Sequence, residues 1–221
     1  MTVAEMAVLF KLELDKVDTL SQPNFLDSEI ELIFNTSQDL LIAKKYSEFE
    51  VNQKRIDDLR TIVSTVPIVP TVVSSTVYSA ALPSDYWFHL ASSTTATGTI
   101  CGVSTTITLV NRLFTFDRLY QALNDPFNQP NEKQALTLFA GNTVQIYVQN
   151  GITPTSLNLT YLRKPLRMSI SATGVNSPVG FTNQCELPDH MHREVVAESV
   201  RRTLESVESV RYNSYRQERT E

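Results

Sequence analysis

The residues that could do chemistry in this sequence are few, and none of them stands in a catalytic pattern. His190 and His192 lie two positions apart at a predicted helix start. They point to different faces of that helix and cannot chelate one metal ion without a third ligand. Asp57 and Asp58 are neighbours on another predicted helix, where adjacent side chains diverge by about 100°, so we interpret them as a solvated helix turn. His89 lies in an apolar predicted strand, which favours a core or interface position.

The motifs of common enzyme and cofactor sites are missing as well. The sequence has no Gly-x-Ser-x-Gly nucleophile turn, and its glycines form no phosphate-binding loop. Cys101 and Cys185 are far apart and have no partner at a metal or redox spacing, so we expect two buried or half-buried free thiols. We therefore predict that the protein is not an enzyme and has no catalytic residue, bound metal or cofactor.

One basic cluster stands out, formed by Arg163, Lys164 and, after Pro165, Arg167. Its simplest interpretation is the charged end of a strand. The alternative is a contact at a subunit interface or in a channel, because the planar guanidinium of arginine pairs bidentately with carboxylates. Arg163, Lys164 and Arg167 are therefore candidate interface residues.

The charge balance does not favour a protein that grips nucleic acid. The net charge is −5, with −5 in residues 1–62, +2 in residues 63–185 and −2 in residues 186–221. This lacks the basic stripe of phosphate-binding proteins, and it is compatible with lining a channel past which DNA slides, or with no relation to DNA. No apolar run approaches the roughly 20 residues of a membrane span, and no secretory signal is visible, so we expect an intracellular product.

Three segments of different composition predict an α+β protein. Residues 1–65 show apolar residues at helical spacing over 3–18 and again from a cap at Asp27 or Ser28 onward, with a break around Pro23. This pattern predicts an N-terminal helical hairpin. Residues 66–185 are rich in Ser, Thr and Val, which fit a pleated sheet.

The expected strands of the 66–185 segment cover residues 71–80, 87–97, 99–109, 143–148 and 156–164, with a short helix at 117–123. Alternation of apolar and polar residues on both sides of Asn150-Gly151 predicts a hairpin over 143–164. We therefore predict a central, antiparallel β-sandwich-like domain.

Residues 186–221 predict a C-terminal amphipathic helix that begins at Asp189. A lone helix of this length is only marginally stable in water, so its apolar stripe needs a cover. The N-terminal helices could provide it, or a neighbouring subunit or another partner protein could. The stripe therefore joins the candidate interface set with Met191, Val195, Val200, Leu204 and Val207.

Short phrases spread along most of the chain carry a family resemblance. They are Ile30–Gln38 (IELIFNTSQ), Leu82–Tyr86 (LPSDY), Asn124–Pro130 (NDPFNQP), Leu159–Pro165 (LTYLRKP) and Glu186–Asp189 (ELPD). They resemble neck, collar or ring proteins of tailed bacteriophages, most closely those of the crAss-like phages of gut Bacteroides.

The resemblance implies a structural virion subunit of the phage neck. Such a subunit forms a homo-oligomeric ring, commonly of twelve copies, that connects the capsid portal to the tail beside other neck ring or tail hub proteins. Genomic DNA passes through its lumen without sequence-specific contact. The resemblance implies assembly in the bacterial host cytoplasm and no catalytic residue.

A second class of function stays open at this point. A head fibre or another receptor- or carbohydrate-binding module of the virion could use the aromatic residues of the β-rich segment, Tyr78, Tyr86, Trp87 and Phe88. Fibres are commonly trimeric and repetitive, and this sequence has no internal repeat. The mass of the native assembly separates about twelve copies from three.

Overall fold

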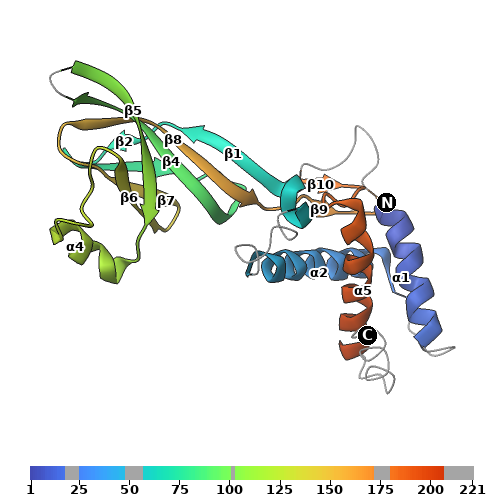
Figure 1. The fold of residues 1–221 in the computed structure, drawn as a ribbon. Helices are drawn as coiled ribbons and strands as arrows, with labels where there is room; N and C mark the ends of the chain where they lie inside the picture. Colours follow the sequence, from blue (N-terminus) through green and yellow to red (C-terminus); the bar gives the residue numbers. More distant parts are fainter. Residues whose placement is uncertain (18–24, 48–56, 101–102, 172–179, 207–221) are drawn as a thin grey trace. The chain divides into compact units, whose positions relative to one another are not determined.

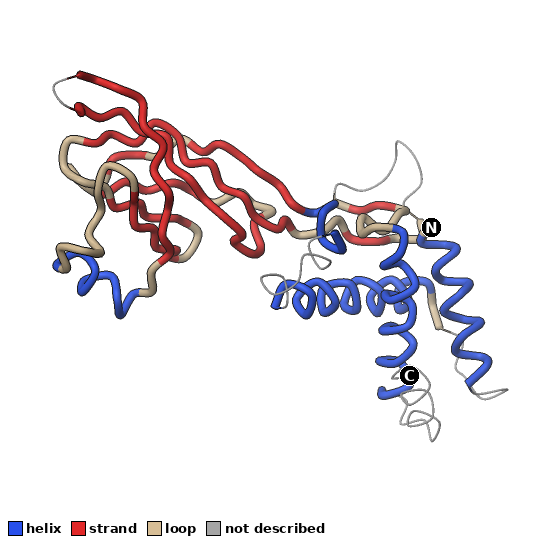
Figure 2. Tube along the Cα trace, viewed as in Figure 1, coloured by secondary structure: helices blue, strands red, loops and turns tan. Residues whose placement is uncertain are grey.

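The computed structural model describes residues 1–17, 25–47, 57–100, 103–171 and 180–206 (Figure 1). The chain divides into two compact units. Unit 1 combines Met1–Ile62 with Pro165–Glu221, and unit 2 is the continuous segment Val63–Lys164. Helices dominate unit 1 and strands dominate unit 2 (Figure 2), which confirms the α+β class.

Unit 1 is built on three helices, α1 (Val3–Val17), α2 (Asp27–Ser47) and α5 (Asp189–Ser206), with a short 3-10 turn, η1 (Arg60–Ile62). A capping box begins α1: the Thr2 amide donates to Glu5 Oε2 at 2.9 Å, and the Glu5 amide donates to Thr2 Oγ1 at 3.2 Å. The α1 and α2 helices meet edge-to-face at Phe10 and Phe34, whose ring centroids lie 5.7 Å apart. The α5 helix packs against both of them.

A small parallel sheet completes unit 1, with β9 (Arg167–Met168) beside β10 (Phe181–Thr182). The side chain of Asn35 on α2 holds β9 as a strand partner would. Asn35 Oδ1 accepts from the Met168 amide at 2.8 Å, and Nδ2 donates to the Met168 carbonyl at 3.0 Å. The segment that follows Lys164 is thereby fixed to a helix more than a hundred residues earlier in the chain.

Unit 2 is one eight-stranded sheet. Its strands are β1 (Val63–Ile68), β2 (Thr71–Val72), β3 (Val77–Ala81), β4 (Tyr86–Ile100), β5 (Val103–Leu113), β6 (Gln134–Ala140), β7 (Thr143–Tyr147) and β8 (Ile152–Arg163). The spatial order is β1-β8-β4-β5-β6-β7-β3-β2. Every pair is antiparallel except β5 with β6, which the helix α4 (Phe116–Asn124) connects.

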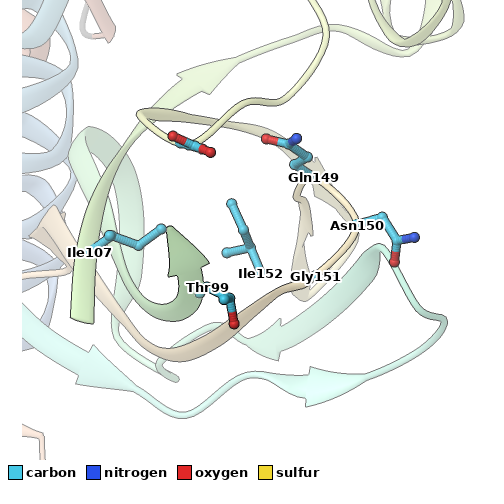
Figure 3. A pocket seen from close by; sticks show the side chains of 8 residues that line it. Thr99, Ile107, Gln149, Asn150, Gly151 and Ile152 are labelled. Atoms are coloured by element: carbon cyan, nitrogen blue, oxygen red, sulfur yellow. The ribbon is translucent and has the colours of Figure 1, made fainter. Parts of the chain in front are cut away.

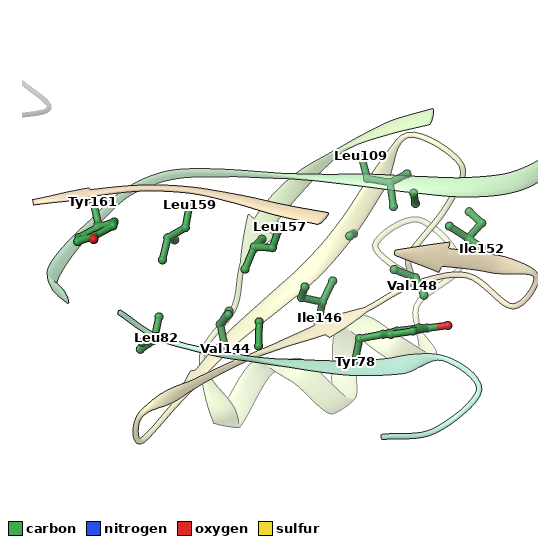
Figure 4. Packing of buried hydrophobic residues seen from close by; sticks show 13 residues of the cluster. Tyr78, Leu82, Leu109, Val144, Ile146, Val148, Ile152, Leu157, Leu159 and Tyr161 are labelled. Atoms are coloured by element: carbon green, nitrogen blue, oxygen red, sulfur yellow. The ribbon is translucent and has the colours of Figure 1, made fainter. Parts of the chain in front are cut away.

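The core of unit 2 lies between two walls of this same sheet. Leu157, Leu159 and Tyr161 on β8 point toward Val144 and Ile146 on β7 (Figure 4). All five are at most 1% exposed. The sandwich-like packing therefore comes from a single sheet that turns back on itself, and not from two separate sheets.

The hairpin predicted over residues 143–164 is wrong, although both of its strands exist. Strand β7 is flanked by β3 and β6, and β8 is flanked by β1 and β4, so neither has a side left for the other. The Asn150-Gly151 turn does form, with Gly151 at φ +88° and the Ile152 amide donating to the Gln149 carbonyl at 3.2 Å. It carries the chain from one wall of the sheet to the other. Strands β1 and β6 were not predicted at all.

Candidate assembly surfaces

The predicted basic cluster is divided between the two units. Arg163 ends β8 in unit 2 and is half-buried, and the next residue, Lys164, is exposed. The Lys164 amide donates to the Asp85 carbonyl at 2.7 Å, which fixes the end of the strand. Arg167 begins β9 in unit 1, where its Nη1 donates to Asp39 Oδ2 at 2.8 Å. Both side chains of this ion pair are partly exposed, so it contributes less than about 1 kcal/mol to stability.

The apolar stripe of α5 is covered inside unit 1. Met191, Val195, Val200 and Leu204 are each at most 1% exposed, and α5 packs on α1 and α2. Val207 lies outside the described residues. Of the two covers that the sequence left open, the chain's own N-terminal helices account for the described part of the stripe. These four side chains therefore stabilise the fold of the subunit.

A charged cluster that the sequence analysis missed lies beside this stripe. Asp58 is 7% exposed; its Oδ2 accepts from Lys45 Nζ at 2.9 Å, and its Oδ1 lies 2.8 Å from His190 Nε2. Lys45 Nζ is also 3.2 Å from Glu194 Oε2. The interpretation of Asp58 as part of a solvated turn is thus wrong, whereas Asp57 is exposed as expected. Only the helical phase of residues 57–59 decides which of the two carboxylates faces inward.

The electrostatics of Asp58 are those of a structural ion pair. Burial alone raises the pKa of this carboxyl group, but the hydrogen bonds of Lys45 and His190 outweigh it and hold the pKa below its ordinary value. The carboxylate therefore stays ionised at neutral pH. It joins α2, the turn before β1 and the start of α5 within unit 1.

The other histidines are structural as well. His192 is 2% exposed, and its Nε2 lies 2.8 Å from the Leu187 carbonyl, to which it donates. Its Nδ1 lies 3.0 Å from the amino group of Met1. In unit 2, burial lowers the pKa of His89, whose ring lies 5.0 Å from that of Phe139. Among the described residues, no group of three or more His, Cys, Asp or Glu side chains could hold a metal ion.

The cysteine that the structure describes is not a reactive one. Cys185 is a buried free thiol in unit 1. Burial raises its pKa to about 11, so the thiolate is scarce at neutral pH. Cys101 lies outside the described residues.

A small pocket opens in unit 2 around the Asn150-Gly151 turn (Figure 3). Its volume is about 150 Å³, and its wall is formed by Gly98, Thr99, Ile107, Glu132, Gln149, Asn150, Gly151 and Ile152. A Cβ at Gly98 would lie 3.4 Å from Ile152 Cγ1, an ordinary van der Waals distance, so this wall would also accommodate an alanine. Among the described residues of the wall, Glu132 is the one ionisable side chain.

Large apolar side chains are exposed around α4 in unit 2. Leu119 and Ala122 of this helix pack on Leu136 and Leu138 of β6. Its outer side carries Phe116 and Tyr120, 64% and 74% exposed, and Phe127 just beyond the helix is 92% exposed.

The loop that carries Phe127 is fixed by hydrogen bonds. Asp125 Oδ1 accepts from the Phe127 amide at 3.0 Å, and Arg112 Nη1 on β5 donates to Asn128 Oδ1 at 2.8 Å. The ring of Phe127 is therefore held in solvent by an ordered loop.

Comparison with known proteins identifies the kind of molecule that carries these surfaces. A sequence model of the family described as phage tail ring protein 3/4 matches residues 1–213. The chain belongs to this family of crAss-like phage ring proteins. No curated protein matches the chain. The match covers every described residue of both units, and it confirms the resemblance drawn from the short phrases of the sequence.

Membership of the ring protein family fixes the function at a coarse level. The chain is a component of the phage tail, in a family of structural proteins. The described helices include none that is long and apolar enough to cross a membrane. The site to look for in a ring protein is a surface by which copies bind one another or their neighbours.

Proposed function

We propose that this protein forms a closed ring, of twelve copies, in the neck of a tailed phage. The ring joins the capsid portal to the tail and surrounds the channel through which the genome leaves the head. The observation that carries the proposal is the match to the tail ring family over residues 1–213. Other neck rings or tail hub proteins are its neighbours on the side away from the portal.

Two physical features support this proposal. Exposed aromatic side chains at Phe116, Tyr120 and Phe127 give the subunit apolar surface to bury on assembly. The net charge of −5 disfavours tight binding of phosphates, as suits a channel through which DNA has to slide. Arg163, Lys164 and Arg167 remain candidate residues for contacts with carboxylates of a neighbouring protein.

The mass of the native assembly tests the proposal. A twelve-fold ring of this 24.9-kDa chain has a mass of about 300 kDa. We expect native mass spectrometry to give this value for the purified protein alone or after addition of the portal protein. A chain that stays monomeric in the presence of the portal would contradict the proposal, and a trimer would favour a head fibre.

A further inference from the structure

More than half of strand β5 has a partner on one side only. β5 pairs with β4 from Val103 to Val110, whereas β6 joins its other side only from Val110 to Leu113. Within the described chain, no backbone group pairs with the outer side of residues 103–109. This stretch, which we call the β5 edge, is an open sheet edge.

The orientation of the β5 edge follows from the bond that ends it. The Val110 amide donates to the Lys133 carbonyl at 2.9 Å and so points away from β4. Amides alternate between the two sides of an antiparallel strand. The amides of Thr106 and Thr108 therefore point outward in the same direction as that of Val110, and both residues are exposed.

A second open edge lies on β1, whose one partner among the described strands is β8. Pro67 has no N–H and lies opposite Asn158 on β8. Proline in a sheet faces its nitrogen to the unpaired side, so the amide of Thr65, two residues earlier, also points outward. We call the outer side of Val63–Ile68 the β1 edge.

Neither edge carries a charged side chain, although Pro67 protects part of the β1 edge and leaves the amides of Val63 and Thr65 as its outward donors. Sheet edges are commonly guarded by charged side chains, lysine above all, and residues 63–68 and 103–109 contain no charge. Exposed valines stand at both edges instead: Val69, just beyond β1, is 76% exposed, and Val103, the first residue of the β5 edge, is 62% exposed. In the order β1-β8-β4-β5, the two edges are the opposite borders of the same four strands.

We propose that the β5 edge of one copy binds the β1 edge of the next copy, so that neighbouring subunits share a continuous sheet. The inference rests on the proposed ring, because a ring requires two different, complementary surfaces on each subunit. Opposite borders of one sheet provide such a pair. Backbone hydrogen bonds supply the attraction, as in other cases of strand addition. Pairing of two β5 edges would instead give a two-fold dimer.

A proline substitution tests the β5 edge because it removes an outward amide and leaves the bonds to β4 intact. The Thr106→Pro/Thr108→Pro variant should keep the circular dichroism of the wild type and bind its neighbour at least tenfold more weakly, so that the ring mass gives way to that of single chains. The matched control, Thr106→Val/Thr108→Val, keeps both amides and should assemble as the wild type does.

The β1 edge allows a complementation test. Thr65→Pro should also yield single chains. Mixed with Thr106→Pro/Thr108→Pro, it should form dimers and nothing larger, because the mixture retains one intact edge of each kind. Hydrogen exchange provides a readout that needs no folded double variant: the Thr106 and Thr108 amides should be protected in the wild-type ring and exchange freely in the Thr65→Pro chain.

The possible results distinguish the proposed edge pairing from the proposed closed ring. A ring that persists in the Thr106→Pro/Thr108→Pro variant, or rapid exchange of both amides in the wild-type ring, would overturn the edge pairing and leave the ring standing. Dimers of Thr65→Pro alone would show β5-to-β5 pairing instead. Open, edge-dependent chains of the wild type would overturn the closed ring and keep the pairing, and a wild type that stays monomeric with the portal would overturn both.

Discussion

A buried carboxylate ties three segments of unit 1 together at Asp58. Replacing it by asparagine removes the charge that neutralises Lys45, whose side chain is 9% exposed. Loss of one partner of a buried pair costs roughly 3 kcal/mol, and the remaining contact with Glu194 offsets part of that cost. We expect Asp58→Asn to lower the free energy of unfolding by this order, measured by urea denaturation at pH 7. The neighbouring Asp57→Asn should change it by less than about 0.5 kcal/mol, and equal effects of the two variants would contradict the ion pair.

The same residue predicts a dependence of stability on acid. The pKa of Asp58 lies below its ordinary value of 3.8 in the folded protein, so the unfolded chain takes up the proton first as the pH falls. The stabilisation from this group is therefore complete above about pH 5 and is lost as the pH drops through the unfolded-state pKa and then the folded-state pKa. The difference in unfolding free energy between wild type and Asp58→Asn should shrink between pH 5 and pH 2. A difference that stays constant over this range would exclude the linkage.

At the residue scale, the sequence shows which residues lack a catalytic pattern better than it shows which side chains are buried. The lack of catalytic patterns around His190 and Asp57 could be judged from spacing alone. The burial of Asp58 could not, because it depends on residues 45 and 190, which tertiary packing brings together. The available signal was that Asp58 stands next to the apolar residues Leu59 and Ile62, which indicates that this turn faces the core. Both of these residues are fully buried.

The structure determines which segments bury the apolar face of helix α5. Leu204 is fully buried against the rest of unit 1, so Leu204→Asp places a charge in an apolar core and removes roughly 2–3 kcal/mol of apolar burial. We expect the variant subunit to lose its helical circular dichroism at room temperature. Arg193→Asp on the exposed side of the same helix is the control and should remain folded. A folded Leu204→Asp subunit that fails only to assemble would move this stripe back to an interface.

Helix α4 and the loop after it carry one buried side chain that stabilises unit 2 and exposed side chains that are available for assembly. Leu119→Ala should lower the stability of unit 2 by about 2–4 kcal/mol, because this side chain is 3% exposed in the small cluster under the helix. Tyr120→Ser and Phe127→Ser should leave stability within about 0.5 kcal/mol and weaken assembly, since exposed aromatic residues anchor interfaces. Thermal unfolding and native mass spectrometry on the same samples distinguish the two effects. Unchanged assembly of Tyr120→Ser/Phe127→Ser would remove this surface from the contact.

Among the elements, periodicity predicts which segments are strands but not how they pair. Residues 143–148 and 156–164 alternate as strands do, and Gly151 adopts the positive φ that a tight turn requires. A turn of this kind usually joins two paired strands. Here the two strands belong to opposite walls of one sheet, because β7 is already flanked by β3 and β6. Such long-range competition for strand edges leaves no local signal.

The whole molecule is a β unit inserted into a helical one. Residues 165–185 have a composition close to that of the preceding strands, so the sequence alone does not separate them from the β-rich segment. Their contacts do separate them: the side chain of Asn35 binds β9, and Glu31 Oε1 accepts from the Ile170 amide at 2.6 Å. The boundary of unit 2 therefore lies where β1 and β8 begin and end together, at residues 63 and 164.

This insertion predicts that each unit folds without the other. Unit 2 is one continuous stretch whose buried cluster, from Tyr78 to Tyr161, comes entirely from its own residues. Val63 lies opposite Leu162 in the β1–β8 pair, so the two ends of unit 2 lie side by side, as the ends of tolerated insertions do. Residues 63–164 alone should therefore unfold cooperatively on heating.

The complementary deletion joins Ile62 to Pro165 through a short Gly-Ser linker. It should keep α1, α2 and α5 folded, because their shared core and the Lys45–Asp58 pair lie within unit 1. Circular dichroism and calorimetry on both fragments provide the measurement, with Leu204→Asp in the deletion variant and Leu157→Asp in the 63–164 fragment as unfolded controls. If either fragment lacks a cooperative transition, the two units depend on one another for stability. Two independent transitions would mean that the strands of unit 2 and the helices of unit 1 can be altered separately.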